Sequence, residues 1–303
     1  PGVITRAPSR LITYRQGMND LVVAQVWRYP AKSMLGERVP SVSVSAAGVL
    51  GDRGWAVRDE VRGGIRGAKK IGDLMHLGAR YVAPPTAHDP TPHIEISFPD
   101  GTSVTSADGD INARISAELG HHVTLWPLQP PDDLDHYRRG AADSDDLLVE
   151  LRDIFGRTED EPLPDLSVFP PEIFEYESPP GTYLDAFPLM VMTTGSVATL
   201  QDHLPDSVLD LARFRPNLVV TAEATPDNPW PEQGWVGRRA TIGTAEVEFV
   251  TGCPRCVMIT RPIRDLPDDR SIMRAVVREA DQNLGVYATV VTPGTIAEGD
   301  QLA

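Results

Sequence analysis

The sequence predicts a mainly β fold of the α+β class, organised as two domains with helices at the periphery. Short segments of alternating apolar and polar residues recur along the chain between turn signals, a pattern typical of small β-barrels or sandwiches. The length of 303 residues suggests two domains or one large domain. A proline-rich acidic stretch at 129–180 interrupts the strand pattern and marks the boundary between them.

These signals divide the chain into four parts. We expect residues 1–20 to form a polar, flexible tail. Residues 21–128 are expected to form a small N-terminal domain like a β-barrel, and residues 181–303 a second domain whose strands close as a barrel. The connecting region at 129–180 carries the acidic run Asp143 to Asp146, which we interpret as a solvated surface.

In the first domain, an apolar segment that ends at Pro30 predicts a strand at 21–29. Alternation of apolar and polar residues predicts a second strand at 39–44. A glycine-flanked turn at 48–53 leads into a strand that reaches residue 57. The sequence Pro99-Asp100-Gly101 predicts a hairpin between strands at 94–98 and 102–105. A helix at 108–119, a strand at 123–128 and a helical turn at 147–154 follow.

In the second domain, an apolar strand is expected at 189–192, followed by a helix from Val197 that residues 194–196 cap. This helix is interrupted near Pro205 and resumes through 208–211. A strand at 213–221, a loop at 221–234 and strands at 237–250 come next. Apolar residues at helical spacing predict a helix at 271–284, and 286–291 reads as the last strand.

Composition narrows the classes of function. The formal net charge of −15 argues against a nucleic-acid-binding protein and against docking on an anionic membrane. No apolar run is long enough to span a bilayer, and residues 1–20 lack the apolar core of a signal peptide. Two cysteines do not form a disulfide framework. These observations together predict a cytoplasmic protein.

The only two cysteines lie in the sequence Cys253-Pro254-Arg255-Cys256. We expect a strand before them, a turn at Gly252 and Pro254, and a second strand at 257–260. Four interpretations compete for the pair. A thioredoxin-type redox pair normally opens a helix, whereas a strand is expected here. A zinc site needs four ligands, and neither a second cysteine pair nor histidines at suitable spacing are present.

The two remaining interpretations stay open on the residues alone. Both cysteines can pack as small apolar side chains. Alternatively, one is a thiolate ligand to a cofactor metal, which the neighbouring cation of Arg255 favours.

Four cations lie at the ends of predicted strands: Lys32, Arg53, Arg215 and Arg255. If they converge, their guanidinium and ammonium groups suit an anion such as a phosphate or carboxylate. The sequence does not show that they converge, and ordinary surface cations are the alternative. Neither a P-loop nor a Gly-x-Gly-x-x-Gly pattern is present, so the common nucleotide sites are not expected.

Several short motifs resemble one known family in their order and spacing. They are Tyr29-Pro30-Ala31-Lys32-Ser33, Gly51-Asp52-Arg53-Gly54-Trp55, Phe214-Arg215-Pro216-Asn217, Cys253-Pro254-Arg255-Cys256 and Pro293-Gly294-Thr295-Ile296. The chain resembles MOSC-domain proteins that carry an N-terminal MOSC β-barrel domain. The family includes amidoxime-reducing components, bacterial reductases of N-hydroxylated compounds and the C-terminal part of molybdenum cofactor sulfurase. The likeness covers about residues 21–303 and is poor at 60–180.

The resemblance implies a molybdenum cofactor, a pterin that carries a dithiolene and a phosphate. It implies that Cys256 is the molybdenum ligand. It also implies that the pterin and phosphate are held by Lys32, Ser33, Arg53, Arg215, Asn217 and Arg255. One position departs from the reductases, which have a Thr-Ser pair where this chain has Ala186-Phe187. Cys253 has no implied role.

The resemblance therefore predicts a molybdenum-cofactor-dependent oxidoreductase that reduces small N-oxygenated molecules. Two cysteines cannot hold an iron–sulfur cluster, so separate electron-donor proteins are expected as partners. One alternative is a sulfur carrier with a cysteine persulfide. The chain lacks the pyridoxal-phosphate half of the sulfurase, so such a carrier needs a sulfur donor. Another alternative is a non-catalytic protein that only binds the molybdenum cofactor.

Overall fold

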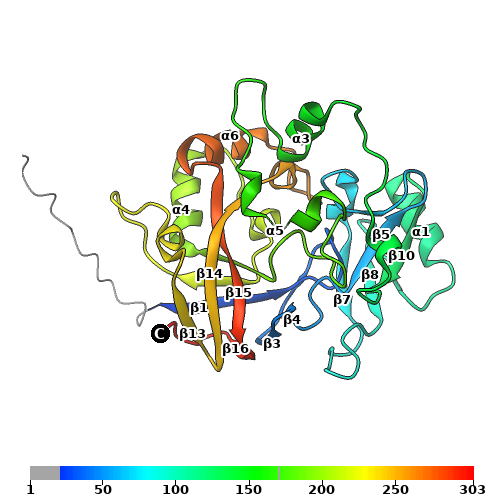
Figure 1. Cartoon of the computed structure of the whole chain (residues 1–303), viewed down its shortest axis with the longest axis horizontal. Helices are drawn as coiled ribbons and strands as arrows, with labels where there is room; N and C mark the ends of the chain where they lie inside the picture. Colours follow the sequence, from blue (N-terminus) through cyan, green and yellow to red (C-terminus); the bar gives the residue numbers. More distant parts are fainter. Residues whose placement is uncertain (1–20, 170) are drawn as a thin grey trace, which may run out of the picture.

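The computed structural model describes residues 21–169 and 171–303, and the tail expected at 1–20 lies outside them. Two groups of strands lie side by side, with helices around them (Figure 1). The predicted mainly β, α+β class is confirmed. Among the described residues, no helix combines the length and the apolar character that crossing a membrane requires.

A seven-stranded sheet forms the larger group. Its order is β13 (Arg239–Ile242), β14 (Ala245–Pro254), β15 (Asn283–Thr292), β11 (Leu189–Thr193), β12 (Leu218–Thr221), β1 (Val22–Arg28) and β2 (Glu37–Arg38). Neighbours are antiparallel except β11 and β12, which helix α4 (Thr194–His203) connects. Strand β1 comes from the start of the chain and pairs with β12 (Figure 1).

The C-terminal residues connect the two sides of this sheet. Leu302 bridges to Ile242 on β13, and Gln301 bridges to Val22 on β1. The strands thereby close around one apolar core, which includes Val26, Val247 and Phe249. Closure satisfies backbone groups that an open edge would expose.

A three-stranded sheet packs against the same core. It consists of β16 (Gly294–Ala297), β3 (Ser41–Ser45) and β4 (Gly48–Val49). On β3, Val42 and Val44 are buried whereas the serines that alternate with them are exposed, as the predicted alternation requires. Residues 22–49 therefore contribute side chains to the core that the C-terminal strands build.

The smaller group of strands forms two three-stranded sheets. One contains β10 (Val123–Pro127), β5 (Trp55–Asp59) and β6 (Ile65–Arg66), and the other contains β7 (Gly78–Tyr81), β8 (Ile94–Ser97) and β9 (Ser103–Thr105). The predicted hairpin is confirmed, with Gly101 in the left-handed region at φ 83°. Helix α1 (Ile111–Leu119) and the 3₁₀ helix η2 (Gly72–His76) complete this core.

The helices of the larger group differ in detail from the prediction. Helix α4 begins earlier than expected, because Thr193 caps it and accepts a hydrogen bond from the Ser196 amide at 3.1 Å. The expected resumption at 208–211 is wrong: helix α5 (Leu211–Phe214) starts only after Asp210, which caps it. Helix α6 (Arg270–Glu279) ends before Asp281 and Gln282, which both have positive φ. The 3₁₀ helix η5 (Pro231–Trp235) lies in the predicted loop.

The connecting region contains α2 (Leu134–Tyr137), α3 (Leu147–Phe155), η3 (Leu166–Val168) and η4 (Pro171–Phe174). The helical turn predicted at 147–154 is confirmed. Asp143 pairs with three cations of the smaller group, Arg62 at 3.1 Å, Arg66 at 3.2 Å and Lys70 at 2.9 Å. Asp146 caps α3. Asp143 and Asp146 are therefore exposed, as a solvated surface requires, and they also make ion pairs and a helix cap.

Candidate functional site around Cys256

The segment that carries the cysteines differs from the prediction. Strand β14 continues through Cys253 and Pro254 instead of turning at Gly252, and Pro254 pairs with Asn283 on β15. The strand predicted at 257–260 is wrong, because these residues form the 3₁₀ helix η6 (Val257–Thr260) with Cys256 as its N-cap. A short apolar run does not distinguish a buried strand from a buried helical turn.

The two cysteines have different surroundings. Cys253 is 2% exposed and packs with Met190, Met192 and Leu284, and burial raises the pKa of its thiol. Cys256 is half-buried and lines a cavity. The helical turn after Cys256 removes the sequence argument against a thioredoxin-type pair. The burial of Cys253 is a new argument against such a redox pair, because a buried thiol with a raised pKa is a poor nucleophile.

This cavity, of about 70 Å³, brings together five of the seven predicted site residues. Its lining includes Arg53, Arg215, Asn217, Arg255 and Cys256. The convergence that the sequence left open therefore occurs for three of the four cations. Lys32 and Ser33 do not line the cavity.

Arg215 and Arg255 are each 6% exposed and carry donors without partners among the described residues. Arg215 Nη1 donates to the Met34 carbonyl, whereas its Nη2 has no hydrogen-bond partner. Arg255 Nη1 donates to the Phe214 carbonyl at 3.0 Å, and its Nε has no partner. Burial lowers the pKa of Arg215 to about 10. Buried charged donors left unsatisfied are costly, so this arrangement fits an anion in the cavity.

Aromatic stacking and an ion pair hold the other cavity groups. The Arg215 guanidinium lies 4.2 Å from the centre of the Tyr29 ring, and that of Arg53 lies at 5.3 Å. Arg53 also pairs with Asp52, which accepts a hydrogen bond from Asn217 Nδ2 at 3.1 Å. Asn217 Oδ1 accepts from the Met190 amide at 3.1 Å, so this side chain links the entrance of β12 to β11.

Lys32 and Ser33 already have partners within the protein. Lys32 is 2% exposed, and its Nζ donates to Ser178 Oγ at 3.2 Å, the Tyr183 carbonyl at 2.9 Å and Asp185 Oδ1 at 3.0 Å. These three bonds use all three ammonium hydrogens. Ser33 Oγ accepts from the Ala68 amide at 2.8 Å.

The structure adds two charged residues beside the cavity that the sequence did not single out. Lys69 Nζ lies 3.1 Å from Asp185 Oδ1, and Asp185 lines the cavity. Burial would raise the pKa of Asp185, but Lys32, Lys69 and Arg53 outweigh it and hold that pKa well below its ordinary value. No sequence signal could have found this pair, because Asp185 follows an irregular region and is more than a hundred positions from both lysines along the chain.

Arg157 is a third residue that the sequence did not identify. It is 6% exposed, and its guanidinium donates to the carbonyls of Arg255 at 3.2 Å and Phe155 at 2.5 Å, and to Gln282 Oε1 at 3.4 Å. Burial lowers its pKa to about 10. The connecting region thus fixes the backbone immediately before Cys256.

The Ala186-Phe187 position forms an apolar part of the cavity wall. Ala186 is buried, and the Phe187 ring stacks on Tyr287 with centroids 5.0 Å apart.

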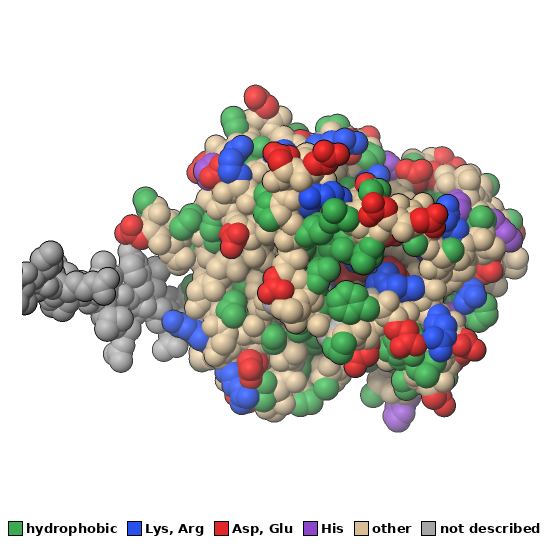
Figure 2. Space-filling model, turned by 45° about the horizontal axis from the view of Figure 1, so that its top comes forward, with side chains coloured by type: hydrophobic (Ala, Val, Ile, Leu, Met, Phe, Trp, Pro, Cys, Tyr) green, Lys and Arg blue, Asp and Glu red, His purple; other side chains and the backbone are tan. Residues whose placement is uncertain are grey.

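Figure 2 shows a face on which hydrophobic side chains gather beside a hollow containing a basic side chain, with acidic and basic side chains interspersed around it. Within the described part of the chain, no group of three or more His, Cys, Asp or Glu could hold a metal ion.

Comparison with known proteins places both halves of the chain in described families. Residues 20–128 match the model of the MOSC N-terminal beta barrel domain, and residues 180–303 match the MOSC domain. The YUAD protein from Bacillus subtilis is a similar solved structure, at 12% identity and a TM-score of 0.42 over 93% of both chains.

Three curated relatives illustrate the similarity. Human mitochondrial amidoxime reducing component 2 is 27% identical over 78% of this chain and 66% of its own length. Human mitochondrial amidoxime-reducing component 1 is 24% identical over 92% of this chain and 81% of its own. Molybdenum cofactor sulfurase from Oryza sativa subsp. japonica is 23% identical over 81% of this chain and 29% of its own. The chain spans less than two thirds of the first of these relatives. With both domain models matched, the chain belongs to the MOSC-domain family and carries its N-terminal beta barrel domain.

Proposed function

We propose that this protein is a molybdenum-cofactor-dependent oxidoreductase that reduces small N-oxygenated molecules. The observation that carries the proposal is the meeting of two buried arginines with unsatisfied donors and the half-buried Cys256 thiol in one cavity. An anionic cofactor with a thiophilic metal would satisfy both kinds of group. The walls of the cavity of about 70 Å³ would have to move apart to admit a whole pterin. The names of the amidoxime-reducing relatives support the choice of substrate class.

In this proposal each cavity residue has a distinct task. When bound, the cofactor would supply two-electron reduction at its molybdenum. Cys256 would be the protein ligand to the metal. Arg215, Arg255 and Arg53 would hold the anionic part of the cofactor by charge-assisted hydrogen bonds.

The remaining predicted residues would act mainly by holding the protein in shape. Asn217 would keep β12 and Asp52 in place. Ser33 holds the Ala68 amide, and a direct contact from Lys32 to the cofactor would require it to give up one of its three hydrogen bonds. The apolar Ala186-Phe187 wall would contribute shape. Either backbone amides would replace the hydroxyl contacts expected there, or the cofactor would be held less firmly.

Partners and location follow from the same proposal. The chain has only two cysteines, and one would be occupied by molybdenum, so electrons would come from separate donor proteins. We propose that the protein acts in the cytoplasm.

Metal analysis and activity assays on purified protein test this function. We expect stoichiometric molybdenum and reduction of an amidoxime by viologen-reduced protein, both abolished by Cys256→Ala and retained by Cys253→Ala. Activity that survives Cys256→Ala but is lost in Cys253→Ala would show that the ligand is wrongly assigned. Molybdenum without turnover would instead indicate a cofactor-binding protein.

The second candidate function is a sulfur carrier, which the similarity to molybdenum cofactor sulfurase favours. Its persulfide would be expected on Cys256, the more accessible thiol. Protein without molybdenum that releases sulfur on treatment with cyanide would support this candidate and contradict the reductase.

A further inference from the structure

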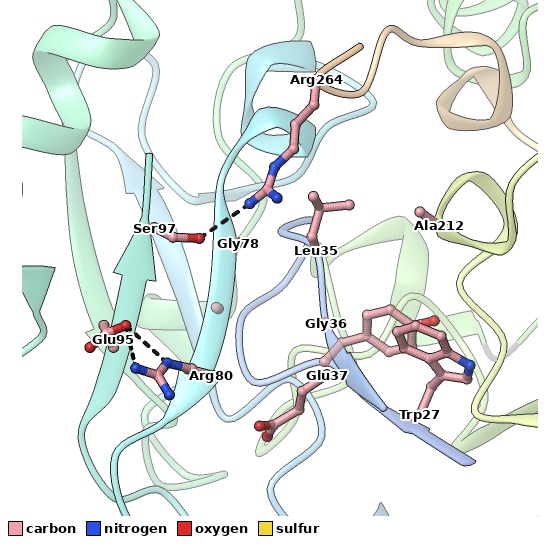
Figure 3. A pocket seen from close by; sticks show the side chains of 12 residues that line it. Trp27, Leu35, Gly36, Glu37, Gly78, Arg80, Glu95, Ser97, Ala212 and Arg264 are labelled. Atoms are coloured by element: carbon pink, nitrogen blue, oxygen red, sulfur yellow. Dashed lines mark hydrogen bonds and ion pairs between the residues drawn. The ribbon is translucent and has the colours of Figure 1, made fainter. Parts of the chain in front are cut away.

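A second cavity, of about 350 Å³, lies outside the set of residues assigned to the cofactor. Strands β1 and β2 line one side, the β7–β8 hairpin lines another, and α5 and the loop after η6 complete it. In Figure 3 the Arg264 side chain extends from this loop toward Ser97, opposite Leu35 and Ala212. This volume lies in the range that small-molecule sites occupy.

The charged groups that line this cavity differ in whether they have an ion-pair partner. Arg80 and Glu95 pair with each other at 2.8 Å (Figure 3). Glu37 pairs with Arg28 at 2.8 Å. The Arg264 guanidinium differs, because among the described residues its one hydrogen bond is to the neutral Ser97 hydroxyl at 3.2 Å. Within the described part of the chain, the exposed Arg264 is therefore the cation of this cavity that forms no ion pair with a carboxylate.

The backbone of Arg264 adopts a conformation that is unfavourable for an arginine, and contacts with neighbouring residues hold it there. Its φ of 48° lies in the left-handed region, which non-glycine residues seldom adopt. Its amide donates to His76 Nδ1 at 2.8 Å, which fixes the loop against η2. A Cβ at Gly78 would lie 2.5 Å from Ser97 Oγ and 3.0 Å from Arg264 Nη2, so the glycine leaves room for this corner.

The opposite wall is largely apolar and aromatic. It includes Trp27, Tyr29, Leu35 and Ala212. A Cβ at Gly36 would lie 2.5 Å from the Tyr29 ring, so the glycine lets the chain approach this ring closely. Tyr29 is 2% exposed and its ring lies against Arg215, so Trp27 is the aromatic side chain of this wall that can accept a planar apolar group.

From this arrangement we infer that the cavity is a binding site for a small planar monocarboxylate. The carboxylate would take the free donors of the Arg264 guanidinium and the Ser97 hydroxyl, since the planar fork of arginine matches a carboxylate. The apolar body would lie along Trp27 and Leu35. A single unbalanced cation favours a monoanion, and the apolar wall favours a carbon skeleton over a free inorganic ion.

Calorimetric titration of the whole protein with benzoate tests the site, and benzamide is the uncharged probe of the same shape. We expect benzoate to bind with a dissociation constant on the order of 1 mM. Benzamide and inorganic phosphate should each bind at least about tenfold more weakly. Equal binding of benzamide would show that the charge plays no part, and equal binding of phosphate would show that the apolar wall plays none. Either result overturns the inference.

Variants locate the binding. Arg264→Gln should weaken benzoate binding at least about tenfold, whereas Arg270→Gln, at a side chain 89% exposed, should leave it unchanged. Ala212→Leu should also weaken binding, because the larger side chain would occupy part of the cavity beside the apolar wall, with folding checked by circular dichroism. Undiminished benzoate binding in folded Arg264→Gln or Ala212→Leu protein would place any benzoate site elsewhere and refute the proposal.

Discussion

The Asp185 carboxylate lies 3.0 Å from Lys32 Nζ and joins the segment just after the connecting region to the first turn after β1. Lys69 shares the same oxygen at 3.1 Å. Lys32 is fully enclosed, whereas the Asp185 side chain is 37% exposed at the cavity. One carboxylate therefore balances a buried cation beside the Cys256 cavity.

Replacing Asp185 by Asn should destabilise the protein by about 1–2 kcal/mol at pH 7, because Lys32 remains buried without a charged partner. The loss should be smaller than for a fully buried pair, since solvent reaches Asp185. Urea unfolding at pH 7 measures the difference. Asp135→Asn is the matched control, because Asp135 belongs to an exposed pair with Arg138 and should change stability by less than about 0.5 kcal/mol.

The same variant should reveal a defined pH dependence. The folded-state pKa of Asp185 is below its ordinary value of about 3.9. Its stabilisation is therefore fully present above about pH 4 and is lost as the pH falls through the folded-state pKa. The difference in unfolding free energy between wild type and Asp185→Asn should shrink at pH 3. An unchanged difference would contradict the role given to the carboxylate.

Replacing Arg157 by Gln should destabilise the protein by about 2–3 kcal/mol, because the Arg255 carbonyl and Gln282 lose a buried charged donor. Thermal or urea unfolding of the variant measures this loss. Arg270→Gln, at an exposed site, should unfold like the wild type. If both variants unfold alike, Arg157 does not hold the backbone before Cys256.

The two thiols should react at different rates in the folded protein. In protein prepared without the cofactor, Cys256 is half-buried and should be alkylated by iodoacetamide without denaturant. Cys253 is enclosed and burial raises the pKa of its thiol, so it should react only after unfolding. Mass spectrometry of tryptic peptides after timed alkylation distinguishes the sites. Labelling of Cys253 first would mean that the core around it opens in solution.

His136 should make the protein less stable in mild acid. It is buried, its Nε2 lies 2.6 Å from the Tyr183 hydroxyl, and burial lowers its pKa from 6.5. The unfolded chain then binds the proton first as the pH drops below about 6.5, so stability falls until the pH is below the folded-state pKa. Unfolding measured between pH 7.5 and 5 should show this slope in the wild type and lose it in His136→Gln.

The exposed His88 provides the control for this pH series. His88→Gln should keep the slope of the wild type. A slope that persists in His136→Gln would assign the acid sensitivity to other groups.

The sequence by itself determined most of the strands and the local setting of the cations. Apolar content ended by a proline predicted β1, period-two alternation predicted β3, and Pro99-Asp100-Gly101 predicted its hairpin. Arg53 and Arg215 were placed beside strands because proline and glycine end or begin strands locally. These features depend on neighbours within a few residues, which is the information that a sequence pattern contains.

Tertiary structure decided which residues meet and how deeply each is buried. Lys32 and Asp185 are separated by 153 positions, and neither lies in a pattern that points to the other. Cys253 and Cys256 share one motif, yet one packs in a core and the other lines the cavity. The run 257–260 forms a helical turn in which Met258 packs in one core and Ile259 in another. Burial and long-range pairing depend on how distant segments pack together, and local periodicity does not encode that packing.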